Sequence, residues 1–518
     1  MKELNGRSEK SITNASIALV YYAIINIFAF VMKMVLTWLI GIEYAGLNSL
    51  LTNVIGVLNI AELGLGIAVG YSLYKPLSEK NYKIINEILL LYKYLYRVIA
   101  LIIAIVGIII TIFINKLVTS EIPVNEIRIC FILYLISTVA SYLLTFLNVL
   151  PSADQKNYII VKIQNNGKII KYVLQILSMY IFRSFYIWLL IEIIVTILTY
   201  IYTNIKVKKH YNWYNEDQKL SLKELLKKYK DIVKSTKNLV FHRIGALVVY
   251  QTDIILISYL GNLTDSGIYS NYMLIYLLLT GVAEQAFNGI TASIGNLIVE
   301  KDSKAIFNVW KEMYVIMMFI TVLFGFLFYQ LANPFISVAF GKDYTLESII
   351  TLGIVVNTMF RIIKNPIDKF KEAYGIFWDI YAPIVESIIN LFFSIILGIK
   401  WGILGIVTGT IISNIVITLC WKPYVIFKYG FKEKISKFIF ITLKYLTIGG
   451  IGVAISYFIL NLIQVNINNE ILNLVVMFVI NGIISVGIIF TCYLIDKYFR
   501  ITLSKYCKIV INMGKKKK

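Results

Sequence analysis

Apolar stretches of about 20 residues recur along the whole chain and constrain its fold more than any other feature. A helix of about this length crosses the hydrocarbon core of a bilayer. Since lipid offers no partner for backbone N–H and C=O groups, each stretch must satisfy its hydrogen bonds internally, as a helix does. The composition agrees, because 58% of the 518 residues are hydrophobic and only 15% are charged. The sequence therefore predicts an all-α polytopic membrane protein.

We expect about fourteen membrane-spanning helices, and an even number places both termini on one side of the bilayer. The expected spans are 12–40, 46–72, 87–114, 127–149, 157–182, 185–205, 238–260, 268–296, 307–332, 348–370, 376–398, 402–427, 436–463 and 471–496. Lysine and arginine concentrate at the termini and in alternate loops, so we expect both termini in the cytoplasm. The net charge of +21 follows from the same bias. It predicts anionic lipid headgroups as partners, and no nucleic acid.

Two pairs of apolar segments repeat each other at a distance of some 221 positions. In the first copy GLNS (46–49) opens a span that contains Glu62, and in the second copy GIYS (267–270) opens a span that contains Glu284. An offset across an even number of helices gives both halves the same topology. We therefore expect a pseudo-two-fold axis along the membrane normal, with a substrate path between the halves.

A long basic segment, 206–237, joins the two halves. Ser221 and Glu224 have the spacing of a capping box, and the apolar residues after Ser221 have helical spacing. This predicts an amphipathic helix on the inner membrane surface. The expected division is a six-helix N-lobe at 1–205, the linker at 206–237, a six-helix C-lobe at 238–430, and two further helices with a basic cytoplasmic tail at 431–518.

Few side chains are available for metal or covalent chemistry. The four cysteines are scattered without a CxxC pair, and the chain has only two histidines. No GxxxxGK[ST] run is present to hold nucleotide phosphates, which excludes an ATP-driven pump on this chain. We expect no metal and no cofactor. The expected outer loops are too short to fold as a catalytic domain, so we do not expect an enzyme.

Several expected spans carry polar side chains at helical spacing, and the clearest stripe runs from Asn357 to Asp368. Ionised groups are costly in lipid, so these side chains point at one another or at a water-filled cavity, and a cavity is the simpler interpretation. The chain has 43 lysines and only seven arginines, yet Arg97, Arg243 and Arg361 fall inside expected spans. The planar, permanently charged guanidinium suits phosphate oxygens, which indicates a phosphate-bearing substrate.

Other interpretations of the charged residues stay open. Arg97 and Lys364 lie within about two turns of the inner ends of their spans and can reach the headgroups by snorkelling. Glu62 and Glu284 can hold the helices of their own lobes together through hydrogen bonds. Asp253 can pair with a cation inside its lobe.

Five stretches in a fixed order carry a family resemblance: GLNS (46–49), AELGLG (61–66), YSLYKPL (71–77), TDIILIS (252–258) and GIYSNY (267–272). With this order the chain resembles the bacterial polysaccharide-biosynthesis flippases. These are the Wzx-type exporters of O-antigen and capsule repeat units, in the MATE-like multidrug/oligosaccharidyl-lipid/polysaccharide superfamily. The resemblance covers essentially the whole chain.

The resemblance implies a pair of six-helix lobes in the bacterial cell membrane that alternate between inward-open and outward-open states. They would move an undecaprenyl-pyrophosphate-linked oligosaccharide to the outer leaflet, with a polysaccharide polymerase and glycosyltransferases as further partners. In such proteins a cationic cavity holds the pyrophosphate. By position we assign Lys33, Arg97, Lys168, Arg243, Arg361 and Lys364 to the headgroup, and Glu62, Asp253 and Glu284 to ion coupling or gating.

Other functions compete with this interpretation. The lipid II flippases share the two C-terminal helices, so lipid II is an alternative substrate. A drug or cation antiporter of the same fold needs carboxylates in its binding site, whereas the basic residues inside the spans favour an anionic substrate. A membrane enzyme such as a repeat-unit polymerase or ligase needs outer loops that this chain lacks, and a structural scaffold has no need of so many intramembrane charges.

Overall fold

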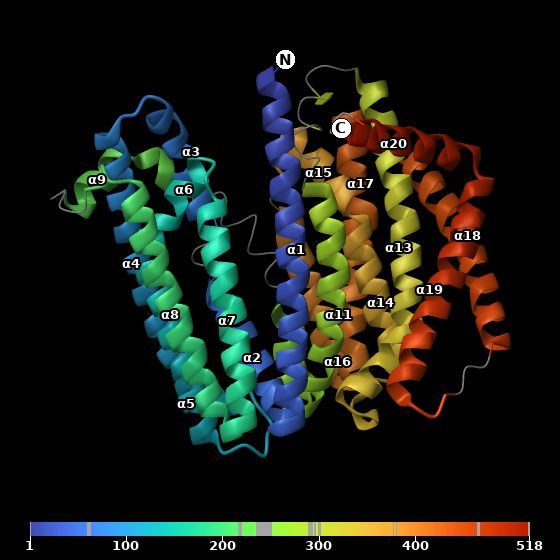
Figure 1. Ribbon diagram of the computed structural model, residues 1–518, viewed down its shortest axis with the longest axis horizontal. Coiled ribbons are helices and arrows are strands. Elements are labelled where there is room, and N and C mark those ends of the chain that lie inside the picture. Colours follow the sequence, from blue (N-terminus) through green and yellow to red (C-terminus); the bar gives the residue numbers. More distant parts are fainter. Residues whose placement is uncertain are drawn as a thin grey trace. The chain divides into compact units, whose positions relative to one another are not determined.

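The computed structural model describes the backbone of residues 2–59, 64–215, 220–234, 251–288, 294, 297–298, 302–376, 378–379, 381–463 and 467–515. Within these ranges the chain is almost entirely helical and forms no strand (Figure 1). Nine helical stretches of the described chain are long and apolar enough to cross a membrane. The prediction of an all-α polytopic membrane protein is confirmed.

The first half of the chain follows the expected order of spans. Its helices are α1 (Lys2–Leu39), α2 (Ile42–Leu58), α3 (Leu65–Ser78), α4 (Tyr82–Phe113), α5 (Val124–Leu144), α6 (Val149–Ala153), α7 (Tyr158–Phe182), α8 (Phe185–His210) and α9 (Leu222–Lys228). Residues 251–260 are helical as well, and the earlier part of the expected span 238–260 lies outside the described residues.

The second half begins at residue 263. Its helices are α11 (Leu263–Asn288), α13 (Ser303–Phe340), α14 (Ser348–Ile363), α15 (Asn365–Ala373), α16 (Tyr381–Asn414), α17 (Lys422–Val425), α18 (Ile435–Leu462), α19 (Glu470–Ile495) and α20 (Lys497–Lys515). Short polar side chains begin several helices, because an oxygen of Asn81, Asp302 or Asn469 accepts a hydrogen bond from the backbone N–H three residues further on.

Two glycines with positive φ interrupt the helices, one inside an expected span and one at an expected boundary. The span expected at 46–72 is divided into α2 and α3, and Gly64 directly before α3 has a φ of 104°. A residue without a Cβ adopts this conformation at little cost. The expected break between 398 and 402 is confirmed at Gly402, which has a φ of 56°. The chain folds back there, since the Ser394 hydroxyl donates to the Ile406 carbonyl at 3.1 Å.

The helices group into two compact units. Unit 1 contains residues 1–270 and 383–406, and unit 2 contains residues 271–382 and 407–518. In unit 1, α4 packs against α5, α5 against α8, α8 against α7, and α7 against α1 (Figure 1). These neighbours are long apolar helices whose packed faces form the interior of the unit. The lobes at 1–205 and 238–430 stay a prediction.

In unit 2, α13 is the central helix and packs against α14, α18, α19 and α20. Its buried aromatic residues Trp310 and Tyr314 stack with ring centroids 4.8 Å apart. Phe427 and Phe438 close around them, with Phe427 meeting Trp310 edge to face at 5.0 Å. This aromatic core connects α13 with the C-terminal helices.

The linker contains the predicted capping box. The Ser221 hydroxyl accepts from the Glu224 N–H, and the Glu224 carboxylate accepts from the Ser221 N–H at 2.8 Å. These hydrogen bonds hold the pKa of Glu224 below its ordinary value. The expected amphipathic helix is interrupted at Tyr229, since α9 ends at Lys228 and residues 230–234 are helical again. It is fastened to α4, since Lys228 and the Tyr229 hydroxyl both donate to Glu87.

Candidate substrate-binding site

Lys33 lies near the middle of the membrane-spanning part of α1 and is only 6% exposed. Its ammonium donates to the Ser270 hydroxyl at 2.5 Å, and Ser270 itself donates to the Gly267 carbonyl at 2.7 Å. A hydroxyl does not neutralise the charge, and an ammonium has three donors. Among the described residues of unit 1, the Lys33 ammonium therefore keeps two donors for a further acceptor.

Asp253 is held by the residue next to Ser270. It is 8% exposed, and the Tyr269 hydroxyl donates to its carboxylate at 3.3 Å. The motif GIYS (267–270) thus bonds two predicted site residues. Its serine bonds Lys33, which we assigned to the headgroup, and its tyrosine bonds Asp253, which we assigned to ion coupling or gating. The sequence did not indicate this link, because Lys33 belongs to a helix more than 200 positions earlier.

The two copies of the internal repeat meet at their motif glycines. A Cβ on Gly46 of α2 would lie 1.9 Å from the Leu263 carbonyl oxygen and 3.0 Å from the Gly267 nitrogen. A Cβ on Gly267 of α11 would lie 2.5 Å from the Ile42 carbonyl oxygen. The backbones of α2 and α11 are therefore in direct contact where only glycine fits. Equivalent positions of the two copies therefore meet in unit 1.

Arg361 and Glu284, assigned to different roles from the sequence, form one ion pair. The Arg361 Nε donates to the Glu284 Oε1 at 2.8 Å, from α14 to α11 in unit 2. The guanidinium also lies 5.8 Å from the centre of the Tyr276 ring. The side chain of Arg361 is 19% exposed and that of Glu284 is 37% exposed, so the pair is accessible from one side. A partly exposed guanidinium is a group that can bind an anion.

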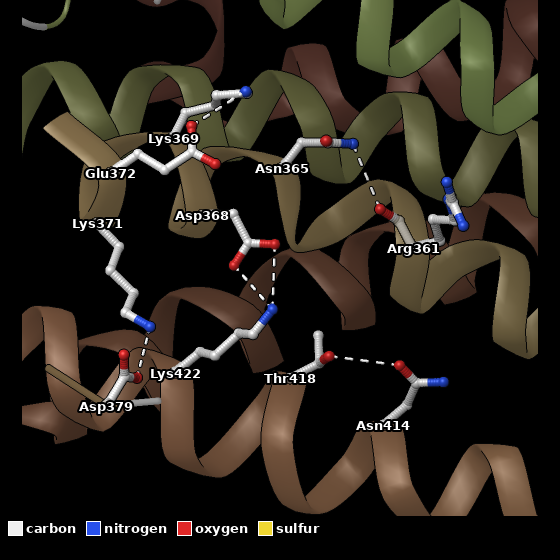
Figure 2. Close-up of polar contacts among 10 residues, drawn as sticks. All are labelled: Arg361, Asn365, Asp368, Lys369, Lys371, Glu372, Asp379, Asn414, Thr418 and Lys422. Carbon is white, nitrogen blue, oxygen red and sulfur yellow. Dashed lines mark hydrogen bonds and ion pairs between the residues drawn. The ribbon is translucent and has the colours of Figure 1, made fainter. Parts of the chain in front are cut away.

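A second set of charges lies around α15, the helix that follows Lys364. Lys422 bonds both carboxylate oxygens of Asp368, at 2.9 and 3.1 Å, and Lys371 bonds Asp379 at 2.5 Å (Figure 2). Lys364 is half-buried at the junction of α14 and α15. The polar stripe expected along 357–368 thus ends in a network of ion pairs in unit 2.

Lys168 faces a small pocket of about 130 Å³ between α7 and α8. The pocket is also lined by Lys171 and Glu192, which form an ion pair at 2.5 Å. Gln175 donates to the same carboxylate at 3.1 Å. Sequence reasoning missed Glu192, although a carboxylate in the middle of the expected span 185–205 is the same signal that singled out Glu62 and Glu284.

The structure does not bring every predicted residue together. Arg97 is exposed on α4, on the same side as Leu101, whose side chain is 61% exposed. This is the position from which a long side chain snorkels to the headgroups. Lys33, Lys168 and Asp253 belong to unit 1, and Arg361, Lys364 and Glu284 to unit 2. Arg243 and Glu62 lie outside the described residues.

No family model and no curated protein matches the sequence. The fold, in contrast, matches solved structures. The lipid II flippase MurJ, in an inward closed conformation, matches with a TM-score of 0.66 at 16% identity, over 92% of this chain and 99% of that chain. The chain has the fold of this flippase.

Two further structures share the fold. An inward-facing multidrug resistance MATE transporter of the MOP superfamily has a TM-score of 0.56 at 12% identity, over 78% of this chain and 94% of that chain. A eukaryotic MATE transporter has a TM-score of 0.52 at 13% identity, over 85% of this chain and 99% of that chain. These three structures are transporters and a flippase, not enzymes. At these identities the likeness establishes the fold, and the substrate must be argued from the site.

Proposed function

We propose that this protein is a flippase that moves undecaprenyl-pyrophosphate-linked oligosaccharide repeat units from the inner to the outer leaflet of a bacterial cell membrane. The lobes at 1–205 and 238–430 alternate between inward-open and outward-open states, and both termini face the cytoplasm. Lys33, Arg361, Lys168 and Lys364 serve the anionic headgroup. The exported units feed cell-surface polysaccharide assembly, together with glycosyltransferases and a polymerase.

The observation that carries this proposal is the environment of Lys33. An ammonium deep inside a membrane span is costly unless another group satisfies it. Its partner among the described residues is a hydroxyl, so the charge is not compensated there. The oxygens of a pyrophosphate headgroup supply both the missing acceptors and the opposite charge. A lipophilic cation would instead be repelled by Lys33, which disfavours a drug antiporter.

The comparison with MurJ supports a substrate carried on a lipid. That structure's name states that it is a lipid II flippase, and its match covers more of this chain than either MATE match does. Lipid II is therefore the second candidate substrate. The MATE transporters keep the cation antiporter as a third candidate, with Asp253 and Glu284 as its carboxylates.

Depletion of the protein in its host distinguishes these candidates. We expect undecaprenyl-linked oligosaccharides to accumulate in the inner leaflet, measured by mass spectrometry of lipid extracts with an impermeant probe that reports the leaflet. The mass of the accumulated species identifies a repeat unit or lipid II. Unchanged lipid-linked sugars together with increased retention of cationic dyes would contradict the proposal and favour the antiporter.

Replacing Lys33 with methionine is expected to lower transport by about 100-fold, since two charge-assisted hydrogen bonds contribute about 3 kcal/mol together. Methionine retains an unbranched apolar stem, so we expect normal abundance in the membrane. The measurement is the leaflet-resolved assay beside an immunoblot of membranes. Ser270→Ala is the matched control, because it removes the hydroxyl partner and leaves the charge; most of its transport should remain. Normal transport by Lys33→Met would remove Lys33 from the site.

A further inference from the structure

The helices α7 and α8 pack side by side in unit 1 (Figure 1). Their side chains leave a long groove along one side of the contact. The groove has a volume of about 1040 Å³. At the contact itself, a Cβ on Gly167 would lie 2.4 Å from the Thr199 hydroxyl oxygen, so the two helices approach closely at this glycine. The wall of the groove is mostly apolar and includes Ile170, Leu174 and Leu198, whose side chains are 41 to 59% exposed. Such a surface is suited to a hydrocarbon chain.

One end of the groove is basic. Lys162 of α7 and Lys206, Lys209 and His210 of α8 line this end, and all four are exposed. The Lys206 ammonium lies 5.3 Å from the centre of the Tyr202 ring, a cation–π contact that positions it beside the apolar wall. None of the described residues that line the groove is acidic.

Asp154, which lies a few residues before α7, is engaged by other groups. Asp154 pairs with Lys156 at 2.7 Å and accepts from the Tyr211 hydroxyl at 2.8 Å. The helix dipole also explains only part of the cluster. Cations suit the last turn of α8, but Lys162 lies near the start of α7, where the dipole favours negative charge. Among the described residues that line it, the mouth of the apolar groove therefore carries basic groups and no carboxylate.

The length of the groove matches one lipid leaflet. From Tyr158 to Leu174 the wall of α7 extends about 24 Å along the helix axis. Half of a bilayer with its headgroup region measures about 20 to 22 Å. The basic end adjoins the segment 206–237, which the charge pattern assigns to the cytoplasmic side, so the groove corresponds to the inner leaflet.

We propose that this groove binds a phospholipid with an anionic headgroup, with one acyl chain along α7 and α8 and the phosphate at Lys162, Lys206 and Lys209. A zwitterionic lipid fills the apolar part equally well but gains little at the basic end. The site lies within unit 1 and does not depend on the transport function proposed above.

Native mass spectrometry of the purified full-length protein tests the proposal, with phosphatidylglycerol and phosphatidylcholine as probes. We expect the wild-type protein to bind phosphatidylglycerol more tightly. The triple variant Lys162→Gln, Lys206→Gln, Lys209→Gln should lose at least about tenfold in that affinity, because each lysine near an anionic surface contributes a factor of about five. Its affinity for phosphatidylcholine should not change.

A matched variant removes the same charge elsewhere. Lys223→Gln, Lys227→Gln, Lys230→Gln changes three exposed lysines in and after α9 that do not line the groove, and should retain the preference for phosphatidylglycerol. Ile170→Trp fills the apolar part and should weaken the binding of both lipids. Equal binding of the two lipids by the wild type, or an unchanged preference in the groove variant, would overturn the proposal.

An apolar groove with a basic end can also hold a prenyl phosphate. Undecaprenyl phosphate is therefore the third probe. We expect it to bind no more tightly than phosphatidylglycerol. Tighter binding that depends on Lys162, Lys206 and Lys209 would assign the groove to the prenyl-linked substrate and would refute the phospholipid site. These experiments measure binding alone, so a failure of the transport hypothesis leaves their result unaffected.

Discussion

Transport is expected to fall by at least about 100-fold when Arg361 is replaced with glutamate, while the protein still reaches the membrane. Arg361 bonds Glu284 at 2.8 Å, so the substitution places two carboxylates side by side. Like charges at about 4 Å repel by about 4 kcal/mol in a partly exposed site, and the water that reaches Glu284 reduces this value. The change also puts negative charge where the pyrophosphate is proposed to bind. The leaflet-resolved lipid assay measures the loss, and an immunoblot of membranes measures abundance.

Arg361→Glu both breaks the ion pair with Glu284 and places negative charge at the proposed headgroup site. Exchanging the two charged residues separates these effects. In the double variant Arg361→Glu, Glu284→Arg the ion pair forms again with its members exchanged, so abundance and thermal stability should match the wild type. If Arg361 binds the headgroup, transport stays low, because the guanidinium now extends from α11. Full recovery of transport in the swap would show that Arg361 acts only through its ion pair with Glu284.

Glu284→Gln tests the role of the carboxylate itself. Lost transport at normal abundance would indicate ion coupling, and loss of the protein from the membrane would indicate a packing role.

The order of helices could be predicted from the sequence because a membrane span is a local property. A run of about twenty apolar residues predicts a membrane-spanning helix, whatever the remainder of the chain contains. The capping box at Ser221 and the break between the expected spans 376–398 and 402–427 were equally local and were confirmed. The break before α3 was missed, since Gly64 adopts a left-handed conformation inside an apolar run that otherwise has the length of one span.

The partners of the charged residues could not be predicted, because they depend on which helices are neighbours. Helical periodicity placed Arg361 on a polar stripe, but only the contact between α14 and α11 shows that Glu284 is its partner. The pair Lys171 and Glu192 arises in the same way, from α7 beside α8. Spacing within one helix predicts which side chains share a face of that helix, but it does not predict which side chains of a neighbouring helix they contact.

Whether a charged side chain inside a span is buried or exposed also could not be predicted, as Arg97 and Lys33 show. Both are cations inside expected spans, and the sequence assigned both to the headgroup. Lys33 is buried against Ser270, whereas Arg97 is exposed beside the apolar residues of α4. A polar stripe predicts a cavity only if the helix turns it inward, and Lys33 is buried where it meets Ser270 of the GIYS motif.

Replacing Gly46 with alanine is expected to destabilise the protein by about 3 kcal/mol or more, at the upper end of the cost of overpacking. The new Cβ would lie 1.9 Å from the Leu263 carbonyl oxygen and 2.8 Å from its carbon. Both are backbone atoms, so no side-chain rotation relieves the clash and α2 must separate from α11. Elsewhere in a helix the same substitution stabilises by about 0.5 to 1 kcal/mol. Thermal unfolding of the detergent-purified protein, followed by size-exclusion chromatography, measures the difference.

Gly450 in α18 and Gly482 in α19 provide the matched controls, because a Cβ on either would meet no atom within 4 Å. Gly450→Ala and Gly482→Ala should leave the unfolding temperature unchanged or raise it. Gly267→Ala should lower it, since its Cβ lies 2.5 Å from the Ile42 carbonyl oxygen across the same contact. The double variant at positions 46 and 267 should cost less than the sum of the single variants, because one separation of the helices relieves both clashes. Additive costs would mean that the two glycines act at independent places, and the direct contact between the repeat copies would then be refuted.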